Sequence, residues 1–248
     1  MKKFTAALLA VLLLFTVTAC AQQDAFDLYT KAMEAQAKIS SMEAQLSMTA
    51  KINLDDVSMD LNMTGTVAEV IRSETDIDMK MVTDMSIMGE DMSVTVYYKD
   101  GYMYQEVLDQ KMKTKMDLNE MLQQANSSSL EFDRNAVTSS SVSKADNGTK
   151  ISFELNPEQI SNAIADVTGS LTDMLGDTDM ALTISYVRYE LVLDKNNLPV
   201  STNMDIGMEL TIEGQTATMD YLVNVHSIAY NTLTVIDFPA NLADYPEA

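Results

Sequence analysis

The sequence is short of several residue types, and each shortage excludes a class of structure or function. Cys20 is the only cysteine among 248 residues, so no disulfide can form within the chain. There is no tryptophan, and the one histidine is His226. Basic residues are scarce, because 16 Lys and Arg stand against 37 Asp and Glu for a net charge of −21. Such a charge repels phosphate backbones, and we therefore expect no nucleic-acid partner.

Motifs of catalysis are also missing. The sequence has no Gly-x-Ser-x-Gly nucleophile elbow, no paired-histidine metal motif and no glycine-rich phosphate loop. His226 lies in an alternating segment and is interpreted as a strand residue with a local hydrogen bond. Clusters of neighbouring acidic residues arise by chance in so acidic a chain. We interpret three such clusters as parts of solvated faces: Asp55 with Asp56, Asp76 with Asp78, and Asp173 with Asp177 and Asp179. The last group lacks the ligand spacing of an EF-hand loop. The sequence thus predicts no enzyme, no cofactor and no metal site.

Methionine is the residue in excess, with 20 in the chain. Its unbranched, polarisable side chain adapts to irregular apolar partners. The methionines therefore either replace leucine in a packed core or line a pliable binding surface, and composition alone favours the core. Clustered thioethers also bind Cu(I), but packing on one strand face explains the same spacing for the two candidate groups: Met79 with Met81, and Met85 with Met88 and Met92.

The first residues have the pattern of a lipoprotein signal. Lys2 and Lys3 precede an apolar run over 4–15, and Val17-Thr18-Ala19-Cys20 follows. The run is shorter than the roughly 20 residues needed to span a bilayer, which disfavours an uncleaved anchor helix. An ordinary secretory signal cut elsewhere is the other alternative. The final four residues resemble the lipobox of bacterial lipoproteins, and this resemblance implies cleavage before Cys20 and diacylation of its thiol.

These features predict the organisation and location of the chain. Residues 1–19 are expected to be a signal peptide that is removed, residues 20–23 a lipidated cysteine with a short tether, and residues 24–248 a single domain. The tether of Ala21, Gln22 and Gln23 reaches only about 10 Å. We therefore expect an extracytoplasmic protein that the acyl groups on Cys20 hold close to a membrane.

Helical periodicity occurs in three places. Asp24 can cap a helix that runs through Ile39, with an apolar stripe at every third or fourth residue. Asp117 and Glu120 form a capping box for a short helix over 117–125. Asn156, followed by Pro157 and Gln159, opens a longer helix that Gly176 would end.

Elsewhere the apolar period is two, which indicates strands with one apolar and one polar face. The predicted strands are 46–52, 57–63, 77–81, 85–87, 92–98, 102–104, 111–116, 151–155, 181–194, 200–212 and 216–227, the last running on towards Val235. Turns are predicted at 55–56, 89–91 and 99–101, where Asp100-Gly101 is a strong hairpin signal. Few helices accompany many strands, so the expected fold is α+β and mainly antiparallel β. We expect one strongly curved sheet, a half-barrel, with the helices packed on its concave side.

The concave face is the candidate binding site. Period two directs one set of apolar side chains inward, where the helices fill the space or leave a cavity for a long apolar ligand. The set is Met48, Met59, Leu61, Met63, Met79, Met81, Met204, Ile206 and Met208.

The chain also resembles bacterial lipoproteins with the LolA/LolB and LppX/LprG type of fold. The resemblance rests on the lipobox, on the hairpin Tyr97-Tyr98-Lys99-Asp100-Gly101-Tyr102-Met103-Tyr104, on the strand Lys111-Met112-Lys113-Thr114-Lys115-Met116 and on the order of elements. It implies a concave face that binds acyl chains of lipids or lipoproteins, with the protein acting as carrier or sensor. Two alternatives stay open: an interaction or structural module with a closed core that recognises an envelope protein partner, and an envelope enzyme, for which no site is assembled.

Overall fold

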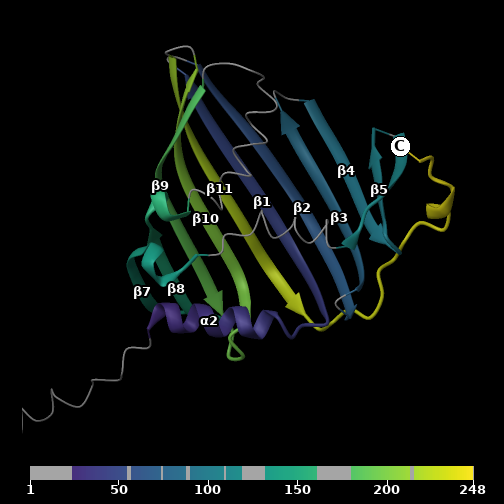
Figure 1. Ribbon diagram of the computed structural model, residues 1–248, viewed down its shortest axis with the longest axis horizontal. Helices are drawn as coiled ribbons and strands as arrows, with labels where there is room; N and C mark the ends of the chain where they lie inside the picture. Colours follow the sequence, from purple (N-terminus) through teal and green to yellow (C-terminus); the bar gives the residue numbers. More distant parts are fainter. Residues whose placement is uncertain are drawn as a thin grey trace, which may run out of the picture.

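The computed structural model describes residues 24–54, 57–73, 75–87, 90–108, 110–118, 132–160, 180–212 and 215–247. These residues form an 11-stranded sheet in the order β6-β5-β4-β3-β2-β1-β11-β10-β9-β8-β7, with each neighbouring pair antiparallel (Figure 1). The strands are β1 (Ser41–Leu54), β2 (Val57–Ser73), β3 (Asp76–Ile87), β4 (Glu90–Lys99), β5 (Tyr102–Val107), β6 (Gln110–Lys115), β7 (Val137–Ala145), β8 (Gly148–Leu155), β9 (Met180–Leu193), β10 (Pro199–Ile212) and β11 (Gln215–Tyr230).

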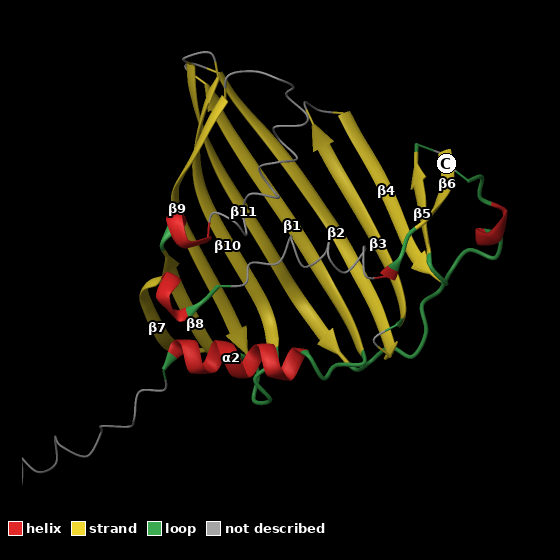
Figure 2. Cartoon of the chain, in the orientation of Figure 1, coloured by secondary structure: helices red, strands yellow, loops and turns green. Residues whose placement is uncertain are grey.

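The sheet consists of two meanders joined side by side. Strands β1 to β6 form one and β7 to β11 the other, and the long β1–β11 pairing unites them. The sheet is open and curved, and α2 (Ala25–Gln36) lies on its concave side (Figure 2). The predicted mainly antiparallel, strongly curved sheet is therefore confirmed. We call the side that carries α2 the inner face and the opposite side the outer face.

Helix α2 begins where its cap was predicted. The Asp24 side chain accepts hydrogen bonds from the backbone N–H groups of Phe26 (2.8 Å) and Asp27 (3.2 Å), which satisfies donors that a helix N-terminus leaves free. Arg134, in the 3₁₀ turn η1 (Arg134–Ala136), donates to the carboxylates of Asp24 (2.9 Å) and Asp27 (2.6 Å). These ion pairs tie the start of α2 to the second meander.

The predicted end of α2 at Ile39 was wrong, because the helix ends at Gln36. The backbone tightens there: the N–H groups of Lys38 and Ile39 each bond a carbonyl three residues back. This turn brings Ser40 to the side chain of Asn231, which accepts a hydrogen bond from the Ser40 N–H (2.7 Å). The chain must reverse at this point to enter β1, and a further helical turn would prevent it.

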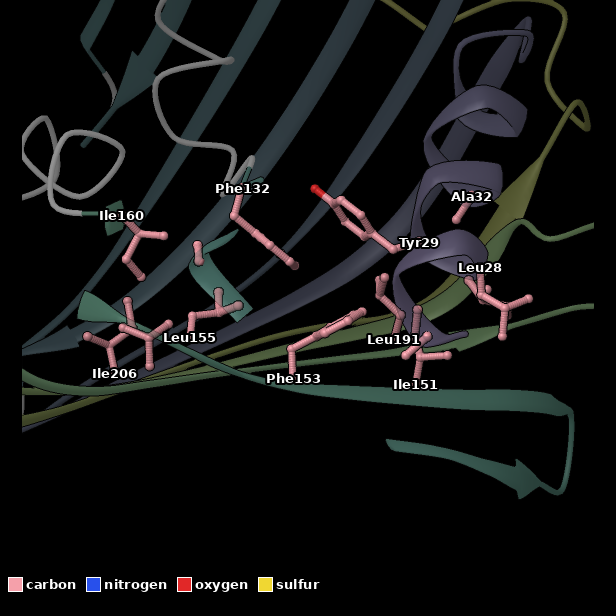
Figure 3. Close-up of a cluster of buried hydrophobic side chains, with 14 of the residues drawn as sticks. Leu28, Tyr29, Ala32, Phe132, Ile151, Phe153, Leu155, Ile160, Leu191 and Ile206 are labelled. Atoms are coloured by element: carbon pink, nitrogen blue, oxygen red, sulfur yellow. The ribbon is translucent and has the colours of Figure 1, made fainter. Parts of the chain in front are cut away.

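The main core lies on the inner face of β8 to β11, where α2, Phe132 and Ile160 pack. Tyr29 of α2 stacks on Phe132 with 4.6 Å between ring centroids, and Phe153 of β8 meets Phe132 edge to face at 5.3 Å. Figure 3 shows the α2 side chains Leu28 and Tyr29 facing Phe153 across this space. Buried residues of four strands complete the cluster: Ile151, Leu155, Val187, Leu191, Leu193, Ile206, Met208 and Met219.

Several strand limits differ from the prediction. Strand β2 continues without a break to Ser73, because its pairing with β1 and β3 persists well beyond Met63. Glu90 and Asp91 belong to β4 and pair with β3, although a turn was predicted there. The turn at Asp100 and Gly101 is confirmed, since both have a positive φ, 53° and 80°.

The two later helices fall mostly outside the described residues. Asn156 caps the second of them as predicted, because its side-chain oxygen accepts a hydrogen bond from the Glu158 N–H at 3.0 Å. Within the described ranges, no helix is long and apolar enough to span a membrane.

The C-terminal segment after β11 packs on the outer face, which the sequence pattern did not indicate. β11 ends at Tyr230 rather than running on to Val235, because Asn231 turns with a φ of 57° and its N–H bonds the Ser41 carbonyl. The segment then covers aromatic residues of β4 and β5, forming a small second core of Tyr97, Tyr104, Leu242 and Tyr245. The Lys113 N–H of the edge strand β6 bonds the Pro246 carbonyl at 2.8 Å, which protects part of that edge from other chains.

Gly148, at the turn between β7 and β8, should not tolerate a side chain. Its φ is +153°, and a Cβ there would lie 1.9 Å from the carbonyl oxygen of Leu193. We expect Gly148→Ala to lower the free energy of unfolding by roughly 2 kcal/mol or more. The matched control is Gly101→Ala, which meets open space and suffers only the cost of a positive φ, about 1 kcal/mol. Equal melting temperatures for the two variants would show that the close approach to Leu193 is absent.

Candidate ligand-binding face

The strand register places all the predicted ligand-binding residues on the inner face. Directly opposite residues of paired strands share a face, and alternate residues of one strand do too. Met48 of β1 lies opposite Met63 of β2 and Val223 of β11, and Val223 lies opposite Met204 of β10. The same pairing and alternation place Met59, Leu61, Met79, Met81, Ile206 and Met208 on this side.

The second meander fills its share of this face with its own core. Ile206 and Met208 of β10 are only 2% and 3% exposed, and both belong to the main core. Met204 is partly buried and packs against the same cluster. These residues are therefore occupied by packing within the protein.

On the first meander the inner-face side chains are less buried than on the second. Met48, Leu61, Met63, Met79 and Met81 are half-buried, and Met59 is 37% exposed. The cross-strand pairs Met48–Met63 and Met63–Met85 form a continuous row of thioether side chains over β1, β2 and β3. We call the residues Met48, Met59, Leu61, Met63, Met79 and Met81 the methionine face. It is an adaptable apolar surface, and contact with a ligand stays a prediction.

A charged residue, Glu69, interrupts the apolar inner face of β2. It lies directly opposite Met42 of β1 and Met79 of β3, and burial raises the pKa of its carboxyl. Within the described part of the chain, no hydrogen-bond donor or basic side chain pairs with it. Sequence reasoning missed this residue, although the signal was present. Glu69 lies an even number of residues from Met63 and Val67, so all three share one face of β2.

Two tyrosines share the same cross-strand row. Tyr230 of β11 lies opposite Met42, and Tyr98 of β4 lies opposite Met79, so the row reads Tyr230, Met42, Glu69, Met79, Tyr98. The Tyr230 hydroxyl is enclosed, and burial raises its pKa to about 12. The Gln36 side chain of α2 opposes this increase. Polar groups thus gather at one end of an otherwise apolar face.

The outer face differs chemically from the inner face. A hollow of about 430 Å³ lies over β7 to β11, lined by serines, charged groups and amides. Ser139 donates a hydrogen bond to Glu154 (3.0 Å), and Ser152 donates one to Glu190 (2.9 Å). Because these polar groups line the hollow and bond one another, it does not suit an apolar ligand.

The remaining candidate residues form no reactive constellation among the described residues. His226 is exposed and lines an outer-face hollow beside Gln45 and Asp84. In the ranges that the structure covers, no group of three or more His, Cys, Asp or Glu side chains could hold a metal ion. Cys20, Asp55, Asp56, Met88 and the acidic group at 173–179 lie outside the described residues.

Comparison with known proteins places the chain in a family. The model of a family of unknown function, DUF6612, matches residues 24–246. The chain belongs to this family. No curated protein matches the sequence.

Solved structures similar to this DUF6612 protein include a lipoprotein and a lipoprotein-sorting protein domain. The lipoprotein LppX of Mycobacterium tuberculosis is 10% identical, with 86% of this chain and 98% of that chain covered and a TM-score of 0.42. LprF of Mycobacterium bovis is also 10% identical, with 87% and 97% covered and a TM-score of 0.34. A putative outer membrane lipoprotein-sorting protein domain of Vibrio parahaemolyticus is 13% identical, with 86% and 95% covered and a TM-score of 0.26. The predicted resemblance to these folds is confirmed, as a likeness of fold alone.

Proposed function

We propose that this DUF6612 protein is an extracytoplasmic lipoprotein, anchored through Cys20, that binds a lipid or another amphiphile as a carrier or sensor. The observation that carries the proposal is the methionine face, where half-buried thioether and leucine side chains form a row over β1 to β3. A surface of this kind adapts to acyl chains of different lengths because methionine has several rotatable bonds. The polar outer face and the net charge of −21 keep the opposite side in water.

The division of the inner face supports this binding role over that of a closed module. The main core fills the inner face of the second meander, and the methionine face belongs to the other half of the same sheet. A ligand at β1 to β3 would replace water on apolar side chains at about 25 cal/mol per Å² of buried apolar area.

Uptake from vesicles tests the proposal. The chain is incubated with phosphatidylcholine vesicles that contain a trace of radiolabelled lipid, separated from them by size exclusion, and counted. We expect label to travel with the protein at close to one lipid per chain. Protein that emerges without label from vesicles of several compositions would contradict the binding role.

Anchoring has its own test. We expect Cys20→Ser to lose metabolic labelling with palmitate and to move from the membrane fraction to the soluble or culture fraction, because the acylated thiol is absent. Thr18→Ser is a matched control, since it keeps a small residue within the lipobox. Equal palmitate labelling of the Cys20→Ser variant would contradict the proposed anchor.

A further inference from the structure

The carboxylate of Glu69, which has no partner among the described residues, indicates the class of ligand. The inner face from β10 to β4 consists of apolar residues, tyrosines, threonines, a glycine and Gln215, and Glu69 is the one charged group on it among the side chains that the structure describes. Val67 and Ile71 flank it along β2, and Met42 and Met79 face it from β1 and β3. None of these neighbours can neutralise a carboxylate or donate a hydrogen bond to it.

A charge in this position is costly for the protein alone. Glu69 is half-buried, and partial removal of a carboxylate from water without hydrogen bonds or a cation disfavours the ionised form. Burial accordingly raises the pKa of Glu69. On the outer face at the same end of β2, the buried Asp78 receives a hydrogen bond from Arg72, so this sheet does pair a buried acid where it serves structure alone.

We propose that Glu69 binds the positively charged head of the ligand, an alkylammonium group, while the methionine face holds the alkyl chain. This inference rests on the proposed function and specifies its ligand class. An ammonium group supplies the missing cation, and Met63 and Met81 extend the apolar surface away from Glu69 along β2 and β3. The enclosed hydroxyl of Tyr230, two strands away at roughly 10 Å by strand spacing, is an additional polar group at this end. Anionic heads are repelled.

The acid dependence of stability gives a first readout on Glu69 without ligand. Its folded-state pKa is raised, so ionisation destabilises the native state, and this penalty is absent below the unfolded pKa and complete above the folded pKa. No charged group faces Glu69 from β1 or β3, and the tyrosines of β11 and β4 stay neutral in this range. Glu69→Gln should therefore melt at a higher temperature than the wild type at pH 7, with the difference shrinking towards pH 4.

A set of amphiphiles with one chain and four heads tests the proposal. Dodecyltrimethylammonium, dodecylphosphocholine, dodecyl maltoside and dodecyl phosphate are titrated into the purified full chain by calorimetry, each below its critical micelle concentration. We expect the ammonium compound to bind roughly tenfold or more tightly than the maltoside, because its trimethylammonium head attracts the Glu69 carboxylate by charge and the maltoside head is uncharged. Preference for dodecyltrimethylammonium alone would indicate a free cationic amphiphile, and equal preference for the phosphocholine would indicate a zwitterionic lipid head.

Two variants separate the local role of Glu69 from the general charge of the chain. Glu69→Gln should remove the preference for the ammonium head while leaving maltoside affinity unchanged. Glu43→Gln changes the net charge equally but lies on the outer face of β1, where Glu43 is opposite Ala68, and it should keep the preference. If Glu69→Gln keeps the preference for the ammonium head, or if both variants lose it equally, the proposed role of Glu69 is overturned while the proposed function stands. If none of the four amphiphiles binds, the proposed function fails with it.

Discussion

Replacing Phe153 with alanine is expected to lower the free energy of unfolding by about 3–5 kcal/mol. Phe153 is only 2% exposed and its ring meets those of Phe132 at 5.3 Å and Tyr29 at 6.0 Å. Removing it leaves a cavity where α2 contacts β8, so both the burial of apolar surface and the edge-to-face ring contacts are lost. The effect is large because this contact holds the helix to the sheet.

Urea unfolding followed by circular dichroism measures this loss as a lower midpoint with an unchanged slope. The control is Leu222→Ala, because Leu222 on the outer face of β11 is 39% exposed and its truncation should cost less than about 1 kcal/mol. If the two variants were equally stable, the aromatic cluster under α2 would not be the main core.

The second large effect is a difference in stability between two aspartate substitutions, one in each half of the inner face. Met208→Asp should unfold a large part of the population, because Met208 is 3% exposed and an unpaired carboxylate there costs about 4 kcal/mol or more in addition to lost packing. Met63→Asp should leave the protein folded, since Met63 is half-buried on the methionine face. We expect Met63→Asp to reduce lipid uptake at least tenfold, because a charge would have to be buried against an acyl chain.

Thermal unfolding and the vesicle assay are measured on the same preparations. Met63→Leu is the matched control, because it changes shape and keeps the surface apolar, and it should retain most of the uptake. Unfolding of Met63→Asp as severe as that of Met208→Asp would show that β1 to β3 are part of a filled core. Normal uptake by a folded Met63→Asp variant would place the ligand elsewhere.

The alternation of apolar and polar residues was sufficient to predict most strands of the sheet. Period two assigned the faces of β1 and β10 correctly, because a strand with one apolar side has only one register that buries it. Asp24 and Asn156 were recognisable as caps from residue type and position. These features depend on neighbours in sequence, which is why sequence alone predicts them.

Features that depend on distant contacts were not predictable. The pairing of β1 with β11 joins segments far apart in sequence, and no local signal specifies it. The packing of Tyr245 against Tyr104 likewise brings the C-terminal segment across the outer face, although the segment has no strand or helix periodicity. Such contacts follow from shape complementarity in the folded state.

The candidate site was predicted in part. Alternation correctly placed Met63 and Met208 on one face, but it could not show that Met208 is enclosed in the main core while Met63 is only half-buried. Which part of a face is enclosed depends on contacts between segments that are distant in sequence. Glu69 was overlooked because a single acid in a strand of 17 residues hardly changes the apolar period.

Native mass spectrometry of a chain that begins at Asp24, with organic extraction of whatever it carries, tests the central claim most directly. This chain lacks Cys20, so any lipid found is a non-covalent ligand rather than the anchor. We predict a bound species of amphiphile mass at close to one per chain, lost from the Met63→Asp variant. An apo mass for the wild type, unchanged after incubation with lipids and with alkylammonium amphiphiles, would contradict the account and leave the methionine face as part of a non-binding structural module.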